Sequence, residues 1–201
     1  MIVIIDYGMG NLKSVYNAFK KYTENVLISS EKKEIENAEK LVLPGVGAFG
    51  DAINNLKNYR LFEIIREKVI QDKAKFLGIC LGLQLIFEES EESPGVKGFS
   101  FIEGKVKKFS LDFLKVPQIG WNSIRKVKEH KVLDGIKSGE YFYFVHSYYV
   151  DPLDNNIILT KTNYGIDYVS SIAMDNIVAF QFHPEKSHNS GLKIIENFIK
   201  W

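Results

Sequence analysis

The chain has 201 residues, and 45% of them are hydrophobic, which is enough for one sizeable domain with a buried core. Its formal net charge of +1 gives no electrostatic reason to expect binding to nucleic acid or to an acidic membrane surface. A single cysteine excludes an internal disulfide framework and fits a reducing compartment. The chain starts with a strand pattern rather than a signal peptide, and no stretch approaches the roughly 20 apolar residues that a bilayer requires. We therefore expect a cytoplasmic protein without a membrane segment.

Strands and helices alternate through the first half of the chain. Continuous apolar runs predict strands at residues 2–5, 25–28, 41–43 and 76–79. Amphipathic patterns predict one helix with Leu12, Val15, Phe19 and Tyr22 on its apolar face, and a longer one with Leu61, Phe62, Ile64, Ile65 and Val69. Apolar strands joined by helices imply a parallel sheet covered on both faces, with ligands beyond the carboxyl ends of the strands.

The second half of the chain is richer in strands. They are predicted at residues 104–109, 141–145, 157–162, 168–174 and 177–182, before a final helix at 187–199. The acidic cluster of Glu88, Glu89, Glu91 and Glu92 is interpreted as a solvated loop. No linker, repeat or zinc-ligand spacing is found. We expect a single domain over residues 1–201 with an α/β fold: a mostly parallel central sheet, flanking helices and extra antiparallel strands in the second half. We expect neither a metal nor another cofactor.

The only cysteine, Cys80, lies between a predicted strand and a helical pattern of Leu83, Ile86 and Phe87. Gly78 and Gly82 flank it, so the segment is the thiol counterpart of the Gly-x-Ser-x-Gly nucleophile elbow. Small flanking residues let the strand and helix pass close to a strained turn, and the helix N-terminus favours the thiolate. A lone cysteine is more often a small buried hydrophobic residue, so the rest of the chain has to support a catalytic role.

That support comes from a second motif near the end of the chain. His183 follows an apolar strand, and Glu185 comes two residues later, after a proline that ends the strand. A nucleophilic thiol needs a base to take up its proton, and the base needs an acceptor that fixes its tautomer. The sequence therefore predicts a triad of Cys80, His183 and Glu185.

A third motif is the glycine-rich loop 44–50, which connects a strand to a helix. Acyl transfer from an amide builds negative charge on the carbonyl oxygen, and backbone N–H donors must face that oxygen. We predict that the N–H groups of Val46 and Leu81 form this oxyanion hole. A phosphate-binding loop is disfavoured because neither glycine motif for phosphate is met.

Together these motifs resemble the class I, triad-type glutamine amidotransferases. Residues 6–12 (DYGMGNL), 120–122 (GWN) and 145–148 (VHSY) further resemble the glutaminase subunits of imidazole glycerol phosphate synthases, and the similarity spans the whole chain. The resemblance implies hydrolysis of glutamine to glutamate and ammonia by the triad. It also implies that the substrate-binding residues are Gly47, Gln84, Ser147 and Tyr148.

The same resemblance implies a heterodimer with a (β/α)8-barrel cyclase subunit, which uses the ammonia to make imidazole glycerol phosphate and an aminoimidazole carboxamide ribotide in histidine biosynthesis. The positions that match the barrel-facing surface are Asn11, Trp121, Tyr143 and Lys186. For Trp121 and Tyr143 the alternative is core packing.

One departure from the family pattern stands close to these positions. Gln118 and Ile119 occupy the place where the family usually has His-Met, in a segment expected near the interface. A paralogous subunit that supplies ammonia to a related barrel synthase therefore remains an alternative. A cysteine hydrolase or protease of related fold, and a catalytically inactive interaction subunit, are further alternatives. His130 and His188 are interpreted as surface histidines, and His146 as a strand-end structural or interface residue.

Overall fold

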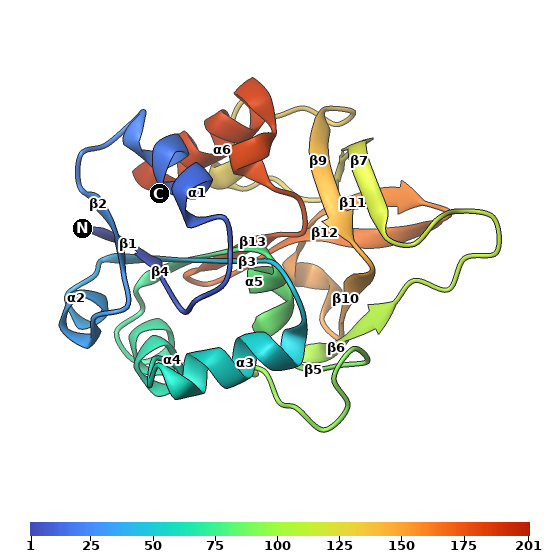
Figure 1. The fold of residues 1–201 in the computed structure, drawn as a ribbon. Helices are drawn as coiled ribbons and strands as arrows, with labels where there is room; N and C mark the ends of the chain where they lie inside the picture. Colours follow the sequence, from blue (N-terminus) through green and yellow to red (C-terminus); the bar gives the residue numbers. More distant parts are fainter.

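The computed structural model describes all 201 residues, which form thirteen strands and six α-helices (Figure 1). The first half contains β1 (Ile2–Ile5), α1 (Leu12–Lys20), β2 (Val26–Ser29), α2 (Lys32–Glu36), β3 (Lys40–Gly45), α3 (Phe49–Asn58), α4 (Phe62–Ile70), β4 (Lys75–Cys80), α5 (Leu81–Leu85) and β5 (Phe87–Ser90). The second half contains β6 (Ile102–Lys108), β7 (Gln118–Ser123), β8 (Arg125–Lys126), β9 (Tyr141–His146), β10 (Tyr148–Pro152), β11 (Ile158–Tyr164), β12 (Ile166–Met174), β13 (Ile177–Phe180) and α6 (His188–Lys200).

The central sheet is parallel on one side and mostly antiparallel on the other. Strands β2, β1, β3, β4 and β13 are parallel neighbours in that order. Beyond β13, strands β12, β10 and β6 continue the sheet in antiparallel pairs, and β5 adds a parallel edge next to β6. A separate antiparallel pair, β7 and β9, stands beside the sheet. The predicted α/β class, with a mostly parallel sheet and extra antiparallel strands in the second half, is confirmed.

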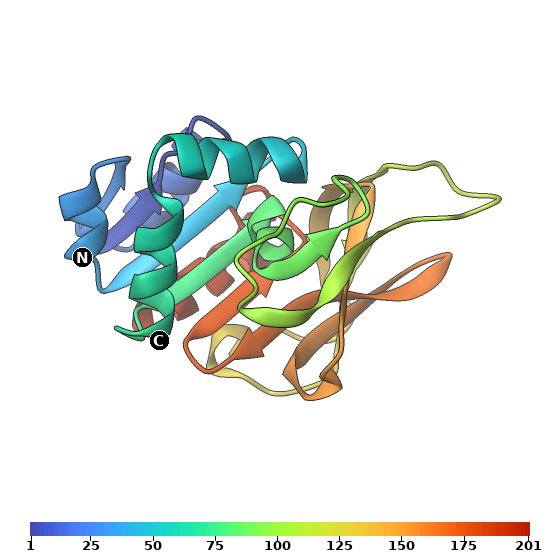
Figure 2. The same cartoon turned by 90° about the horizontal axis from the view of Figure 1, so that it is seen from below.

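Alternate side chains of β1 serve two cores on opposite faces of the sheet. Val3 and Ile5 pack into the cluster that contains the apolar residues of α2, α3 and α4. Ile2 and Ile4 pack into the cluster that contains those of α1 and α6. Figure 2 shows α3 and α4 in front of the strands and α6 behind them. A strand buried on both faces cannot alternate apolar and polar residues, which explains the continuous apolar runs of the sequence.

The helix predicted after Gly82 is shorter than its apolar pattern indicated. It ends at Leu85, and Phe87 begins β5, so the assignment of Phe87 to a helix was wrong. The carbonyl of Leu85 accepts a hydrogen bond from Phe99 N at 2.8 Å, and that of Ile86 accepts one from Phe101 N at 2.9 Å. A distant segment of the chain takes up these carbonyls, so the helix does not continue.

The acidic cluster is not a free solvated loop, as the sequence had suggested. Glu88 and Glu89 lie within β5. The carboxylates of Glu88, Glu91 and Glu92 accept hydrogen bonds from the backbone N–H groups of Gly104, Lys108 and Phe49, respectively, at 2.8–2.9 Å. Each carboxylate therefore satisfies a backbone donor of another segment.

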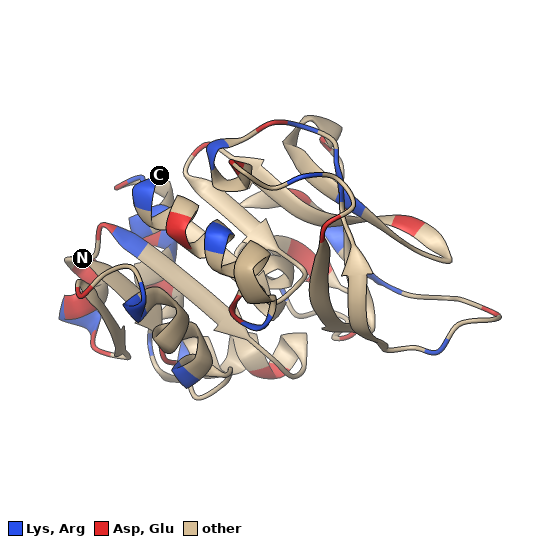
Figure 3. Cartoon of the chain, turned by 90° about the horizontal axis from the view of Figure 1, so that it is seen from above, with Lys and Arg blue, Asp and Glu red and all other residues tan.

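Charged residues of both signs are scattered over the helices and loops, whereas the central strands carry few of them (Figure 3). No helix of the chain combines the length and the apolar character needed to cross a membrane.

Candidate active site

Cys80 occupies a strained turn between β4 and α5. Its backbone angles are φ 54° and ψ −107°, a left-handed conformation that residues with side chains rarely adopt. A Cβ atom on Gly82 would lie 1.9 Å from the carbonyl oxygen of Leu43, and one on Gly78 would lie 2.8 Å from the backbone of Gly82. The two glycines therefore allow the close approach of strand and helix that this turn requires.

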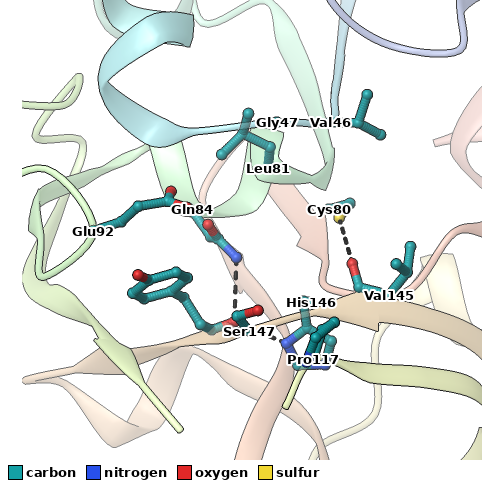
Figure 4. Close-up of a pocket in the computed structure, with 11 residues that line it drawn as sticks. Val46, Gly47, Cys80, Leu81, Gln84, Glu92, Pro117, Val145, His146 and Ser147 are labelled. Atoms are coloured by element: carbon teal, nitrogen blue, oxygen red, sulfur yellow. Dashed lines mark hydrogen bonds between the residues drawn. The ribbon is translucent and has the colours of Figure 1, made fainter.

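The sulfur atom of Cys80 lies beside a cavity. Sγ is 3.8 Å from the carbonyl oxygen of Val145 and 3.8 Å from Nε2 of Gln181. Cys80 is only 5% exposed, but it lines a cavity of about 340 Å³, within the size range of small-molecule sites (Figure 4). A small substrate in this cavity could reach the thiol.

His183 and Glu185 follow β13, the strand parallel to β4, so both lie at the same edge of the sheet as Cys80. Nδ1 of His183 donates to Oε1 of Glu185 over 2.8 Å, and both side chains are almost completely buried. The Ser187 hydroxyl fixes the turn, because it donates to the His183 carbonyl at 2.6 Å and accepts from Tyr143 N at 3.0 Å.

Because Nδ1 is engaged by Glu185, Nε2 is the ring nitrogen of His183 left to exchange a proton, and it is buried without a hydrogen bond. Burial lowers the pKa of the His183 imidazole, but the neighbouring Cys80 thiol and the Glu185 carboxylate raise it, to about 10 overall. A protonated imidazole at this position stabilises negative charge on the sulfur.

The cavity brings together several of the residues singled out in the sequence. Its lining residues are Val46, Gly47, Cys80, Leu81, Gln84, Glu92, Pro117, Val145, His146, Ser147 and Tyr148. The two residues predicted for the oxyanion hole and the four predicted for substrate binding are among them. The sequence analysis did not assign Glu92, Pro117, Val145 or His146 to the site.

The glycine-rich loop is held at both ends. The Tyr7 hydroxyl donates to the carbonyl of Pro44 at 3.0 Å, and Glu92 accepts from Phe49 N at 2.8 Å. Between these anchors, Gly47 has φ +99°, and the exposed Val46 side chain stands at the cavity rim. Tyr7 and Glu92, which lie outside the loop in the sequence, therefore hold it against the cavity.

Three of the four residues predicted to face a partner form one cluster beside His183. Trp121 and Tyr143 lie on paired strands β7 and β9, with ring centroids 6.1 Å apart, and Lys186 Nζ is 5.7 Å from the Tyr143 ring. The Tyr143 ring centroid is 6.4 Å from that of His183. Trp121 is 45% exposed, so it is not a core residue.

Asn11, the fourth of these residues, is exposed and caps α1, where its side chain accepts from Ser14 N. His188 is exposed and stacks flat on the Trp121 ring with centroids 4.8 Å apart, so it extends the same cluster. His130, which the sequence analysis interpreted as a surface histidine, also has a local structural role. It is half-buried, and Nδ1 accepts from Val132 N at 3.2 Å.

Gln118, one of the two residues that depart from the family pattern, does not lie at the surface where the interface was expected. Gln118 is 3% exposed and pairs with His146 across β7 and β9, whereas Ile119 is 63% exposed. The buried amide therefore belongs to the interior behind the cavity, and only Ile119 can face a partner. No three His, Cys, Asp or Glu side chains are grouped so that they could hold a metal ion.

A strained cysteine at a strand–helix turn, with a buried histidine–carboxylate pair at the end of the adjacent parallel strand, defines a class of α/β enzymes that use a thiol for acyl transfer. The sequence profile of the family described as "Glutamine amidotransferase class-I" matches residues 3–201. The chain therefore belongs to the class I glutamine amidotransferase family, which agrees with the resemblance drawn from its motifs.

Two of the most similar curated relatives carry the same name. "Imidazole glycerol phosphate synthase subunit HisH" of Aquifex aeolicus is 51% identical over 197 residues, covering 98% of this chain and 94% of the relative. The protein of the same name from Methanocaldococcus jannaschii is 50% identical over 200 residues, covering 100% and 99%.

Among solved structures, one described as "Crystal structure of glutamine amidotransferase" has a TM-score of 0.78 at 16% identity and covers 100% of this chain and 98% of its own. The glutaminase domain of Trypanosoma brucei CTPS with bound acivicin has a TM-score of 0.68 at 16% identity, covering 99% and 93%. At these identities the similarity shows a shared fold.

Proposed function

We propose that the chain, as one domain, hydrolyses glutamine to glutamate and ammonia, and that Cys80, His183 and Glu185 carry out the reaction. The observation that carries the proposal is that Cys80 lines the cavity at the end of β4, while the hydrogen-bonded His183–Glu185 pair follows the neighbouring parallel strand β13 and lies close enough to Cys80 for the sulfur to affect the imidazole. The name shared by relatives at about half identity over the full chain supports it.

In the first step, the Cys80 thiol gives its proton to Nε2 of His183, and the sulfur attacks the side-chain amide carbon of glutamine to form a tetrahedral intermediate. Negative charge develops on the carbonyl oxygen, and we assign its stabilisation to the N–H groups of Val46 and Leu81, both cavity residues. His183 then gives its proton to the departing amine, so that ammonia leaves and a thioester remains.

In the second step, Nε2 of His183 takes a proton from water, and the resulting hydroxide attacks the thioester and releases glutamate. Glu185 accepts the Nδ1 hydrogen bond throughout, which keeps Nε2 directed to the reacting atoms. This cycle returns the thiol and imidazole to their starting protonation.

The cavity also has groups suited to the amino-acid end of glutamine. Glu92 is the only acidic side chain in the lining, and a carboxylate there complements the α-ammonium group. Gly47, Ser147 and Tyr148 line the remaining wall, and Gln84 lies one turn after Cys80. We assign these residues to substrate binding.

We propose that the ammonia passes to a (β/α)8-barrel cyclase subunit in a heterodimer that works in histidine biosynthesis. The partly exposed cluster of Trp121, Tyr143 and Lys186 next to His183 suits a docking surface over the ammonia exit. Asn11 extends this surface from α1. A reactive thiol that must stay reduced also fits the cytoplasm.

Mass mapping after reaction with a diazo-ketone analogue of glutamine tests the nucleophile. We expect a single label on Cys80, which an excess of glutamine prevents. A label elsewhere, or none, would refute the assignment.

Complementation of a histidine-requiring strain that lacks its own subunit tests the pathway and the partner. Growth supports the histidine-pathway cyclase, whereas a protein that copurifies with another barrel synthase and does not support growth would indicate the paralogous function. We expect low glutaminase activity of the isolated chain and a large rise in the complex.

A further inference from the structure

A buried histidine next to the cavity has no part in the mechanism above. His146 ends β9, is 6% exposed and contributes to the cavity wall (Figure 4). Its ring packs against Phe109, Phe144 and Tyr168, with centroid distances of 5.2–5.7 Å. An apolar residue would fill this space more favourably, since burying a polar ring costs free energy unless it is hydrogen-bonded.

Both ring nitrogens of His146 have partners. Nδ1 lies 2.8 Å from the carbonyl oxygen of Tyr148, and Nε2 lies 3.3 Å from the hydroxyl of Tyr168. A carbonyl only accepts, so Nδ1 carries the proton of a neutral imidazole, and the Tyr168 hydroxyl lies beside the unprotonated Nε2. The contact with Tyr148 spans two residues and fixes the turn between β9 and β10 that holds Ser147 at the cavity.

The same carbonyl holds a residue of the site. Gln84 Nε2 donates to Tyr148 O and to Gln181 Oε1, each at 3.2 Å. Nε2 of Gln181 in turn lies 3.8 Å from the Cys80 sulfur. The two amides are therefore aligned between the carbonyl that His146 fixes and the nucleophile.

On the other side, the Tyr168 hydroxyl donates to Oε1 of the buried Gln118 at 3.0 Å. Gln118 begins β7, the strand that exposes Ile119 and Trp121. His146 thus stands midway in a series of polar contacts that runs from the nucleophile to the first residue of the proposed docking strand.

We propose that His146 is a positioning residue of the glutaminase site: by holding the Tyr148 carbonyl it orients Gln84 and Gln181 against the Cys80 sulfur and sets the wall that receives glutamine. The inference rests on the proposed function, because it concerns the same cavity. The neutral state agrees with burial, which lowers the pKa of His146 to about 4, together with the nearby charge of His183.

Two amide variants separate this role from simple packing. In His146→Asn the side-chain nitrogen occupies the place of Nδ1 and can still donate to Tyr148 O. In His146→Gln the nitrogen occupies the place of Nε2, and the donor to Tyr148 is lost. Both variants remove the aromatic ring, so they are matched for the loss of packing.

The measurement is the rate at which Cys80 of the full chain is labelled by the diazo-ketone glutamine analogue, divided by the rate with iodoacetamide, which carries no glutamine recognition group. We expect His146→Gln to lower this ratio about tenfold, as for one lost hydrogen bond that orients the site, and His146→Asn to stay within about threefold of wild type. Tyr149→Phe is a control, because Tyr149 packs on Phe109 in the same aromatic cluster.

Equal ratios for the two amide variants would overturn the positioning role, whatever their stability. Circular dichroism of each variant reports folding, and if His146→Gln does not fold, His146→Ala replaces it, with the same expected tenfold loss and the same overturning result. Failure of wild-type Cys80 to react with the glutamine analogue, while iodoacetamide labels it, would instead refute the proposed function.

Discussion

Acidification should destabilise the fold through His146 in a defined pH range. The pKa of this imidazole is about 4 in the fold and has an ordinary value of 6.5, because burial opposes the charged form. Between these values the unfolded chain binds a proton that the folded chain does not, so the free energy of unfolding falls as the pH falls. The difference corresponds to about 3 kcal/mol, a substantial part of the stability of a domain.

The assay is urea unfolding followed by circular dichroism at several pH values between about 7 and 4.5, for wild type and for His146→Asn. Carboxylates titrate in the same range, but they do so in both proteins, so the quantity of interest is the difference between them. We expect wild type to lose about 2 to 3 kcal/mol more than the variant between the two ends of the range. Parallel pH dependences of the two proteins would refute the argument.

His183 acts in a separate range and does not confound this measurement. Its pKa is raised in the fold, so its contribution to stability is fully present below its ordinary value of 6.5 and is lost as the pH rises toward about 10. Above neutral pH, wild type and His146→Asn should therefore lose stability together.

Three further changes test the site. Gly82→Ala would place a Cβ atom 1.9 Å from the Leu43 carbonyl oxygen, and we expect a loss of about 2 kcal/mol or more in urea unfolding together with slower labelling of Cys80; an unchanged midpoint would contradict the steric argument. Glu185→Gln removes a carboxylate that raises the pKa of His183, so we expect a lower His183 pKa in an NMR titration and a fall in glutamine turnover of the complex by at least about 100-fold. An unchanged His183 pKa would show that the Glu185 carboxylate, 2.8 Å from Nδ1, does not control the imidazole. Trp121→Ala should weaken binding to the barrel partner by roughly 2 kcal/mol in calorimetry and leave labelling of the isolated chain by the glutamine analogue unchanged; equal affinity would exclude Trp121 from the docking surface.

The elbow could be predicted because its requirements are local. Gly78 and Gly82 are spaced so that neither Cβ would fit, and Cys80 stands between them at a positive φ. Continuous apolar runs were equally informative for the parallel half of the sheet, where the strands are buried on both faces. The family motifs then pointed to glutamine amidotransferases, a family to which the chain belongs.

Other features depend on contacts between segments that are far apart in the chain. The apolar pattern after Gly82 is compatible with a longer helix, and only the backbone of residues 99–101 ends it by bonding to Leu85 and Ile86. Glu92 lies in an acidic segment that is typical of a loop, yet its carboxylate accepts a hydrogen bond from Phe49 N and lines the cavity. The sequence does not show which donor a carboxylate will bind, so it does not distinguish a bound carboxylate from a solvated one.

The amino-acid sequence by itself determined the glycine-flanked turn at Cys80, the order of the motifs and the family, because glycine spacing and apolar runs act through sterics and burial over a few neighbouring residues. Only the tertiary structure decided that Gln118 is buried and that His146 bridges β10 and β12. Hydrogen-bond partners of buried polar groups come from whichever strands the fold places beside them, and that choice is made by the packing of the whole chain.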